Sequence, residues 1–263
     1  MQDRCRICGK ITELTKDHVP PKSLGNYKNL KYNKAFSLFD DYIGPEYFSR
    51  NARGGLYFQT ICKECNSHVL GDRKDRALKE FYDSVANSLS EIILVPRFIN
   101  CSIEVNNVAR SVIGHLLAAK EDYDSSKKEN VLREYVLNED SMPSAGMKLY
   151  YFLYPYKSIF INRDSAYAER INYKNKVMIF SCFYVFPIAF LLTSGELDLE
   201  LNDMFSYCTD RPDERKTILF DLESQYIPHT KNLRHFQWPF DLNADDSICI
   251  PSKYKVSTRT APL

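Results

Sequence analysis

The feature that most constrains this chain is a pair of C-x2-C motifs, Cys5 with Cys8 and Cys62 with Cys65, separated by 53 residues. Each motif places two thiolates around a tight turn, which suits two corners of a tetrahedral metal site. Four sulfurs leave no open coordination position, so we predict a structural zinc ion; a redox dithiol is the alternative. Because the gap is longer than in a compact zinc finger, the ion should join two ends of a longer module.

The rest of the composition describes an ordinary globular chain whose length of 263 residues accommodates two domains. Eight cysteines are too few for a disulfide scaffold, and the absence of a signal peptide is expected from a motif beginning at residue 5. A reducing, cytoplasmic location follows from both observations. The remaining cysteines are interpreted as buried or free thiols: Cys101, Cys182, Cys208 and Cys249.

The apolar run at residues 177–192 raises the question of a membrane span. It has sixteen residues, is rich in β-branched and aromatic side chains, and contains Pro187. This length is at or below the minimum for a spanning helix, so we predict two buried strands with a break near residues 184–187. A transmembrane helix is the minor alternative, and no membrane association is expected.

The periodicity of apolar residues gives a coarse order of elements. Residues 1–66 are rich in loops and should need a metal to fold. The pattern then predicts a helix at 66–89, extended chain at 91–107, a helix at 108–121, a charged loop at 122–146, and strands from 148 to 192. A domain boundary is expected in the region 86–108, so the first domain is taken as residues 1–85 and the second as residues 86–263.

Between the cysteine pairs lies the segment TKDHVPPKSL at residues 15–24, and CKECN follows at 62–66. With the initial C-x-x-C-G, this order of motifs resembles the HNH endonuclease family over residues 4–80. The resemblance implies an N-terminal ββα-metal HNH module with structural zinc over residues 1–85. With the helices and strands that the periodicity predicts beyond it, the expected fold is α+β, with a mixed α/β C-terminal domain. The role of residues 86–263 would be recognition of a substrate, a partner or a trigger.

The same resemblance assigns roles to three residues. His18 would be the general base for the attacking water, and its ordinary pKa of about 6.5 suits that task. Asp17 and Asn66 would be oxygen ligands of a catalytic Mg²⁺ or Mn²⁺ ion. In a regular strand Asp17 and His18 point to opposite faces, and the Pro20-Pro21 break is expected to permit the distortion that brings both to one site.

These roles imply a metal-dependent hydrolase that cuts phosphodiester bonds, with DNA as the expected partner. Residues 1–80 hold 15 Lys and Arg against 10 Asp and Glu, which mildly favours a phosphate-rich partner, although many such surfaces bind no nucleic acid. By resemblance, the biological setting is restriction or anti-phage defence. A homo-oligomer or a partner protein could form through the C-terminal domain.

One position departs from the family pattern. Tyr57 stands where the family places its middle Asn, nine residues before Asn66, and Asn51 or a displaced turn at Gly54-Gly55 could substitute. The alternative function is therefore a catalytically inactive, zinc-stapled module that binds nucleic acid or protein. A third reading, in which the aromatic-rich C-terminal half is the main functional domain, also stays open.

Four further polar residues receive structural interpretations. His68, Asp72 and Asp75 are expected on solvated helix surfaces rather than among the metal ligands. His115 is expected to be a core histidine on an apolar helix face.

Overall fold

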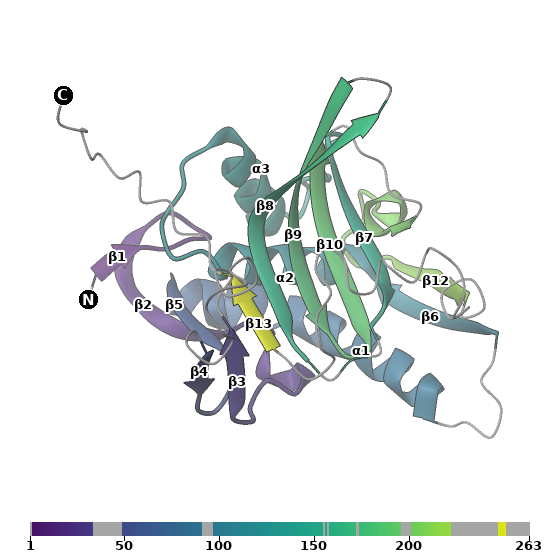
Figure 1. Ribbon diagram of the computed structural model, residues 1–263, viewed down its shortest axis with the longest axis horizontal. Helices are drawn as coiled ribbons and strands as arrows, with labels where there is room; N and C mark the ends of the chain where they lie inside the picture. Colours follow the sequence, from purple (N-terminus) through teal and green to yellow (C-terminus); the bar gives the residue numbers. More distant parts are fainter. Residues whose placement is uncertain are drawn as a thin grey trace.

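The computed structural model has a mixed α/β architecture, with a large sheet, a small sheet at one end, and helices packed between and behind them (Figure 1). The residues that it describes are 2–33, 49–90, 97–154, 156, 158–171, 174–195, 201–221 and 247–250. Within these residues, no helix combines the length and the apolar character that crossing a membrane requires.

The small sheet carries both cysteine pairs. Its three antiparallel strands, in spatial order, are β1 (Gln2–Arg4), β2 (Ile11–His18) and β5 (Tyr57–Cys62). β5 continues into the short π-helix η4 (Cys65–Leu70), and helix α1 (Lys74–Ser90) follows. The helix predicted at 66–89 is therefore present as two consecutive helical segments, and two antiparallel strands precede it in the chain.

The large sheet has eight strands in the order β11–β7–β10–β9–β8–β13–β3–β4. In that order they are β11 (Asn202–Asp203), β7 (Met147–Leu153), β10 (Ile188–Gly195), β9 (Lys174–Val185), β8 (Phe160–Ile171), β13 (Ser247–Ile250), β3 (Leu30–Asn33) and β4 (Ser49–Ala52). The hairpin β3–β4 comes from the segment between β2 and β5. β13 pairs in parallel with β3 on one side and β8 on the other, so it connects this hairpin to the rest of the sheet.

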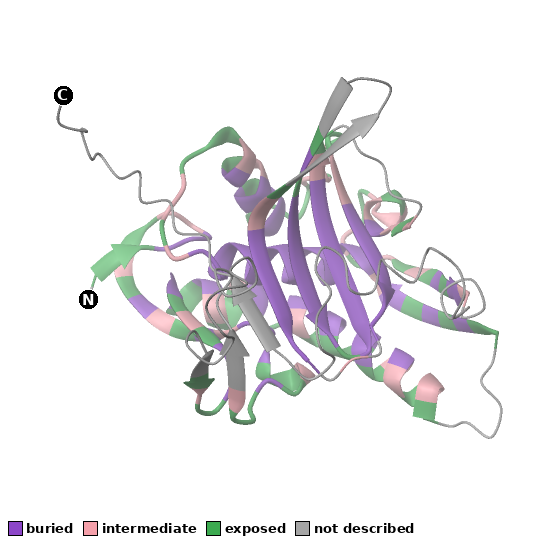
Figure 2. Cartoon of the chain, viewed as in Figure 1, coloured by how far each residue is buried: buried purple, intermediate pink, exposed green. Residues whose placement is uncertain are grey.

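The apolar run at 177–192 forms most of β9 and β10, which pair antiparallel around a turn at Phe186-Pro187. This confirms the prediction of two buried strands and excludes the spanning helix. Phe183 and Phe190 contact helices on one face, whereas Tyr184 packs with Phe152 on the other. Burial on both faces explains why these strands read as a continuous apolar run (Figure 2).

Helices α1 and α2 (Val105–Ala118) lie on one face of the large sheet. From α1, the Tyr82 hydroxyl donates to the Ile188 carbonyl at 2.8 Å. From α2, the His115 ring lies 6.4 Å from that of Phe183. α2 also reaches the small sheet, where the Thr60 hydroxyl donates to the Ala118 carbonyl at 2.5 Å. All residues of α2 are buried because both sheets contact this helix.

The buried apolar residues form one core cluster that extends across both sheets and the helices. Core residues before and after residue 85 belong to this cluster. The division into residues 1–85 and 86–263 stays a prediction about organisation, since the packing continues across that position. The remaining two strands, β6 (Phe98–Glu104) and β12 (Arg215–Asp221), form a separate antiparallel pair, and the 3-10 turn η5 (Met204–Tyr207) precedes β12.

The prediction of a charged loop at 122–146 is wrong over eleven residues, which form helix α3 (Lys127–Leu137). Ser126 caps this helix by accepting a hydrogen bond from the Glu129 backbone N–H. A serine followed three residues later by a glutamate is a capping signature. The segment was predicted as a loop because it is highly charged and because the narrow apolar face of α3 gives only a weak helical periodicity.

Candidate metal centre and the Asp17–His18 segment

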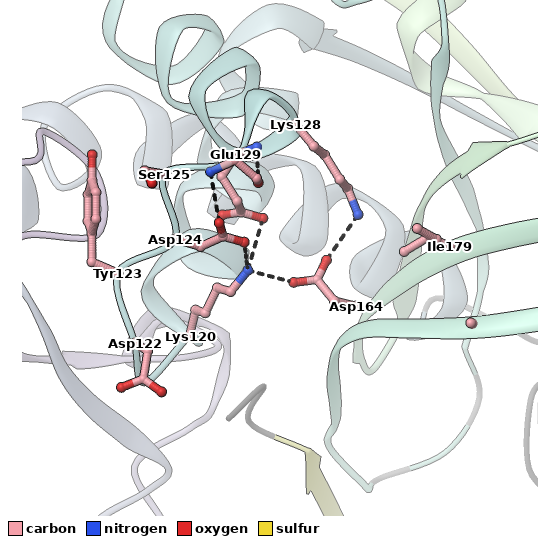
Figure 3. Close-up of a pocket in the computed structure, with 11 residues that line it drawn as sticks. Lys120, Asp122, Tyr123, Asp124, Ser125, Lys128, Glu129, Asp164 and Ile179 are labelled. Carbon is pink, nitrogen blue, oxygen red and sulfur yellow. Dashed lines mark hydrogen bonds and ion pairs between the residues drawn. The ribbon is translucent and has the colours of Figure 1, made fainter. Parts of the chain in front are cut away.

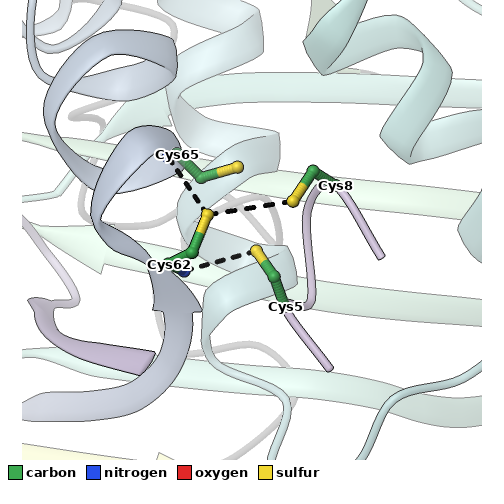
Figure 4. Close-up of side chains that lie close together, drawn as sticks. All are labelled: Cys5, Cys8, Cys62 and Cys65. Carbon is green, nitrogen blue, oxygen red and sulfur yellow. Dashed lines mark hydrogen bonds between the residues drawn. The ribbon is translucent and has the colours of Figure 1, made fainter. Parts of the chain in front are cut away.

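The four predicted cysteine ligands come together at the junction of the small sheet and η4 (Figure 4). All four Sγ atoms lie within 4.8 Å of one another, and those of Cys8 and Cys62 are 3.8 Å apart. A tetrahedral zinc ion with Zn–S bonds near 2.3 Å separates its sulfurs by about 3.8 Å, whereas a disulfide has an S–S bond of about 2.05 Å. The cluster could therefore hold a metal ion such as zinc, and its thiols are free.

Backbone turns aim these sulfurs at one another. Gly9, at φ +73°, donates its N–H to the Cys5 carbonyl at 2.9 Å and so closes the first turn. In the second, the Cys65 N–H points to the Cys62 sulfur at 3.5 Å, while the Cys62 N–H points to the Cys5 sulfur at 3.4 Å. Backbone N–H groups directed at sulfur stabilise the thiolate form that a metal requires.

The pKa values of these cysteines show that four neighbouring thiols do not all ionise readily. A hydrogen bond from Cys65 lowers the pKa of Cys5 to about 4, and the same bond raises the pKa of Cys65 far above its usual range. Burial raises the pKa of Cys8 to about 11. Hydrogen bonds within the protein thus favour the thiolate form of only some of these four cysteines. A divalent cation is the partner that would stabilise all four thiolates.

Asp17 lies in β2 at a β-bulge, where the register with β5 shifts between Thr15 and Asp17. The strand is therefore distorted directly before Asp17, while the role expected for the Pro20-Pro21 break stays a prediction. Asp17 is only 5% exposed and its Oδ2 lies 3.0 Å from His115 Nδ1. Among the described residues, no group hydrogen-bonds its second oxygen, Oδ1.

His115 links Asp17 to a second carboxylate. Its Nε2 lies 2.9 Å from Asp75 Oδ1, which also accepts a hydrogen bond from the Ser111 hydroxyl at 2.6 Å. Burial alone would lower the pKa of His115, but the charges of Asp75 and Asp17 outweigh it and raise this pKa to about 10. His115 is buried, as predicted, but its partners are charged, and the expectation of a solvated Asp75 is wrong.

His18 follows Asp17 and is half-buried on the other side of the strand. Its Nε2 lies 3.1 Å from the Gly54 carbonyl oxygen. Because a carbonyl only accepts, Nε2 donates the proton, and Nδ1 of the neutral ring holds the lone pair. Burial lowers the pKa of His18, although the Gly54 carbonyl and the nearby Asp17 charge act in the opposite direction. The neutral imidazole is thus favoured, and within the part of the chain that the structure describes its Nδ1 has no hydrogen-bond partner.

Asn66 directly follows Cys65, the fourth cysteine of the cluster, and lies in η4 against β2. Its Nδ2 donates to the Thr15 hydroxyl at 3.1 Å and to the Lys16 carbonyl at 3.0 Å. Both bonds use the amide nitrogen, so Oδ1 has no hydrogen-bond partner among the described residues. The structure brings Asn66 next to the backbone that leads into Asp17, while no direct hydrogen bond joins the side chains of Asp17, His18 and Asn66.

The turn that holds His18 is fixed by a residue the sequence did not single out. Asn26 is fully buried, and its amide donates to the carbonyls of Pro20 and Leu56 while accepting from the Leu56 N–H. A Cβ at Gly55, which has φ +99°, would collide with the Asn26 carbonyl. Asn26 and this glycine turn thus fix the segment that carries the Gly54 carbonyl; the only sequence signal was a Gly25-Asn26 turn.

The two residues discussed for the middle-Asn position lie elsewhere. Asn51 is in β4, opposite Lys31, with an exposed side chain. Tyr57 pairs with His18 across β2 and β5, and their rings are 5.8 Å apart. The Lys16 ammonium lies 4.6 Å from the centroid of the same tyrosine ring. Tyr57 therefore forms an exposed aromatic surface beside the histidine rather than an amide brace.

The remaining predictions concern side chains outside this group. The His68 side chain is 64% exposed and lies near Asp72, itself 70% exposed, so both solvated assignments are confirmed. Cys101 and Cys182 are buried free thiols and Cys208 is half-buried, whereas the Cys249 side chain lies outside the described part of the chain. Within the described residues, the cysteine cluster is the one group of three or more His, Cys, Asp or Glu side chains close enough to hold a metal.

A second polar region is a pocket of about 670 Å³ beside α3 and β8 (Figure 3). Its centre is Lys120, which lies 2.8 Å from Asp124 and 3.0 Å from Asp164. Arg163, fully buried beneath the pocket, pairs with Glu129 at 2.6 Å. Positive and negative groups alternate, so the charges are largely compensated within the protein.

Comparisons of the chain with protein-family models, with curated proteins and with solved structures found no match. The resemblance to HNH endonucleases therefore stays an expectation drawn from the sequence motifs alone.

Proposed function

We propose that this protein is a metal-dependent endonuclease that hydrolyses phosphodiester bonds in nucleic acid, with DNA as the first substrate to test. The observation that carries the proposal is the His18 imidazole, which donates from Nε2 to the Gly54 carbonyl and whose Nδ1 has no hydrogen-bond partner among the described residues. It follows Asp17 in a strand whose antiparallel partner leads, through the cysteine cluster, to Asn66. This is the strand–strand–helix order that the HNH resemblance implies.

The side-chain oxygens of Asp17 and Asn66 are of the type that suits a hard divalent cation. Asp17 Oδ1 and Asn66 Oδ1 both lack hydrogen-bond partners among the described residues, and carboxylate and amide oxygens are ligands that Mg²⁺ and Mn²⁺ accept. Magnesium commonly uses one or two carboxylates and completes its shell with water and substrate phosphate. The residues present therefore fit one weakly held ion, which would stabilise the charge that develops on the phosphate.

The chain's own residues account for the proton transfer. His18 Nδ1 would take a proton from the attacking water, while Nε2–H keeps its bond to the Gly54 carbonyl and fixes the ring orientation. Lys16 and Lys22 are exposed near this histidine, where they could contact the phosphate backbone. The cysteine cluster, holding zinc, would fix the position of the strand and of Asn66 without contacting substrate.

The test is cleavage of supercoiled plasmid by the purified protein with Mg²⁺ or Mn²⁺. We expect nicking that His18→Ala reduces by 100-fold or more, in line with the 10²–10⁴-fold contribution of general bases. His68→Ala is the matched control, because this exposed histidine lies in η4 outside the proposed group. Equal cleavage by wild type and His18→Ala would remove the catalytic assignment.

A second candidate is a zinc-stapled module that binds nucleic acid without cutting it. The exposed Tyr57 ring with Lys16 over it favours this function, because aromatic and basic side chains together form a stacking surface for bases. A Mn²⁺ titration separates the two candidates. The nuclease should show a weak Mn²⁺ site that Asp17→Ala abolishes, whereas the binding module should hold zinc alone and lose affinity in Tyr57→Ala.

A further inference from the structure

The chain Asp17–His115–Asp75 connects the proposed cation site to a helix far away in the sequence. His115 lies in α2, 98 residues after Asp17, and its ring is 1% exposed. Both neighbours of the ring are carboxylates, which accept but do not donate when ionised, so each ring nitrogen must donate. His115 therefore bridges two acidic side chains by one hydrogen bond from each side of its ring.

We propose that His115 is a positioning residue for the catalytic cation: by holding Asp17 Oδ2, it presents Oδ1 of that carboxylate to the ion. This inference rests on the proposed function. Without His115, the Asp17 side chain could rotate, and either oxygen could turn toward the protein. A hydrogen-bond partner behind a ligating carboxylate typically changes metal affinity 10–100-fold.

The position of His115 is itself fixed from three sides. Its Nε2 lies 2.9 Å from Asp75 Oδ1, and the Ser111 hydroxyl holds that carboxylate oxygen by donating to it at 2.6 Å. The Phe183 ring of the large sheet lies beside the imidazole. At the preceding residue, a Cβ on Gly114 would collide with Leu70, so α2 approaches η4 as closely as a glycine permits. The large sheet and α2 thus determine where Asp17 points.

This arrangement gives the region after residue 85 a concrete part in the proposed reaction. This part does not depend on the predicted recognition role of residues 86–263. Helix α2 supplies a residue that acts through Asp17 rather than on the substrate. Asp17 is the only residue of the proposed site that α2 contacts by a hydrogen bond among the described residues.

The test measures Mn²⁺ binding by electron paramagnetic resonance on the full-length, zinc-loaded protein. We expect His115→Gln to weaken Mn²⁺ binding 10–100-fold, while zinc content and DNA affinity without divalent ion stay at the wild-type values. Plasmid cleavage should fall at low Mn²⁺ and recover at high Mn²⁺, because a positioning defect is overcome by mass action. A purely structural defect would not recover.

Two further variants keep the test decisive. Asp75→Ala removes the anchor of His115 from a partly exposed position and should weaken Mn²⁺ binding in the same direction, even if His115→Gln fails to fold. His68→Gln is the control histidine and should bind Mn²⁺ as wild type does. Wild-type Mn²⁺ affinity in folded His115→Gln or Asp75→Ala would overturn the inference and leave the nuclease proposal intact. A wild-type protein without any Asp17-dependent Mn²⁺ site would overturn both.

Discussion

The small sheet and the large sheet of this protein are stabilised in different ways. In β2, only Leu14 and Asp17 are buried, and the surrounding loops are held by four thiols and the Asn26 hydrogen bonds. In β10, six consecutive residues are buried between packed aromatic rings. The stability of the small sheet thus depends on the cysteine cluster and a few hydrogen bonds, and the proposed active site lies in this part. The stability of the large sheet depends on the apolar area that it buries.

The largest expected effect comes from removing the metal link. Cys62→Ser should abolish zinc binding, and hydrogen exchange should then show loss of protection in β1, β2 and β5 while β9 and β10 stay protected. Structural zinc sites contribute on the order of 10 kcal/mol to folding, more than this sheet's own burial can replace. Cys208→Ser, outside the cluster, should keep the zinc. Equal loss of protection in both sheets would contradict the proposal that the two sheets are stabilised in different ways.

The next largest effect is expected from a substitution that creates a cavity beside the large sheet. Phe190 is fully buried against Phe81 and Phe183, so Phe190→Ala should lower the free energy of unfolding by about 3–5 kcal/mol in a urea titration. Val177→Ala, at a site in β9 that is 47% exposed, should change it by less than about 0.5 kcal/mol. The zinc content of both variants should equal that of wild type, and zinc loss in Phe190→Ala would show that the sheets unfold as one unit.

A smaller effect is expected from Asn26. Asn26→Ala leaves the buried Leu56 N–H and carbonyl without their partner and should cost about 1–3 kcal/mol. Cleavage should also fall, because the turn that fixes His18 loses its support. Asn138→Ala is the matched control, since the exposed Asn138 amide donates to Glu134 at the end of α3, outside this turn. A stable, fully active Asn26→Ala variant would show that the Gly54-Gly55 turn keeps its conformation without the Asn26 hydrogen bonds.

The smallest effect concerns the charged pocket and depends on pH. Burial alone would raise the pKa of Asp164, but the Arg163, Lys128 and Lys120 charges outweigh it and lower this pKa below its ordinary value. A folded-state pKa below the unfolded value of about 3.9 means that the stabilisation is complete above that pH and is lost as the pH falls through the folded-state pKa.

Asp164→Asn should therefore cost on the order of 1 kcal/mol at pH 7 and flatten the acid dependence below about pH 4. Asparagine tolerates the backbone φ of +53° at this position, so the change tests the charge alone. Thermal unfolding of both proteins from pH 3 to 7 measures the effect. An unchanged slope below pH 4 would assign the acid sensitivity to other carboxylates.

Local patterns predicted most of the elements and the cysteine cluster. The cysteine spacing, the helix after Asn66 and the break in the apolar run each depend on neighbours in the chain, and the structure has all three. The Asp17–His115 pair could not be predicted, because it joins residues 98 positions apart and a lone histidine in an apolar helix has no distinguishing signal. α3 could have been found, since its capping residues were visible in the sequence.

The placement of β13 has a consequence for the order in which the protein is made. This strand, at residues 247–250, pairs with β3, a strand from the loop that also carries the Gly54 turn. A ribosome-bound chain that has not reached residue 250 lacks the strand that joins this loop to the large sheet. The proposed nuclease activity would then be delayed until residues 247–250 have left the ribosome.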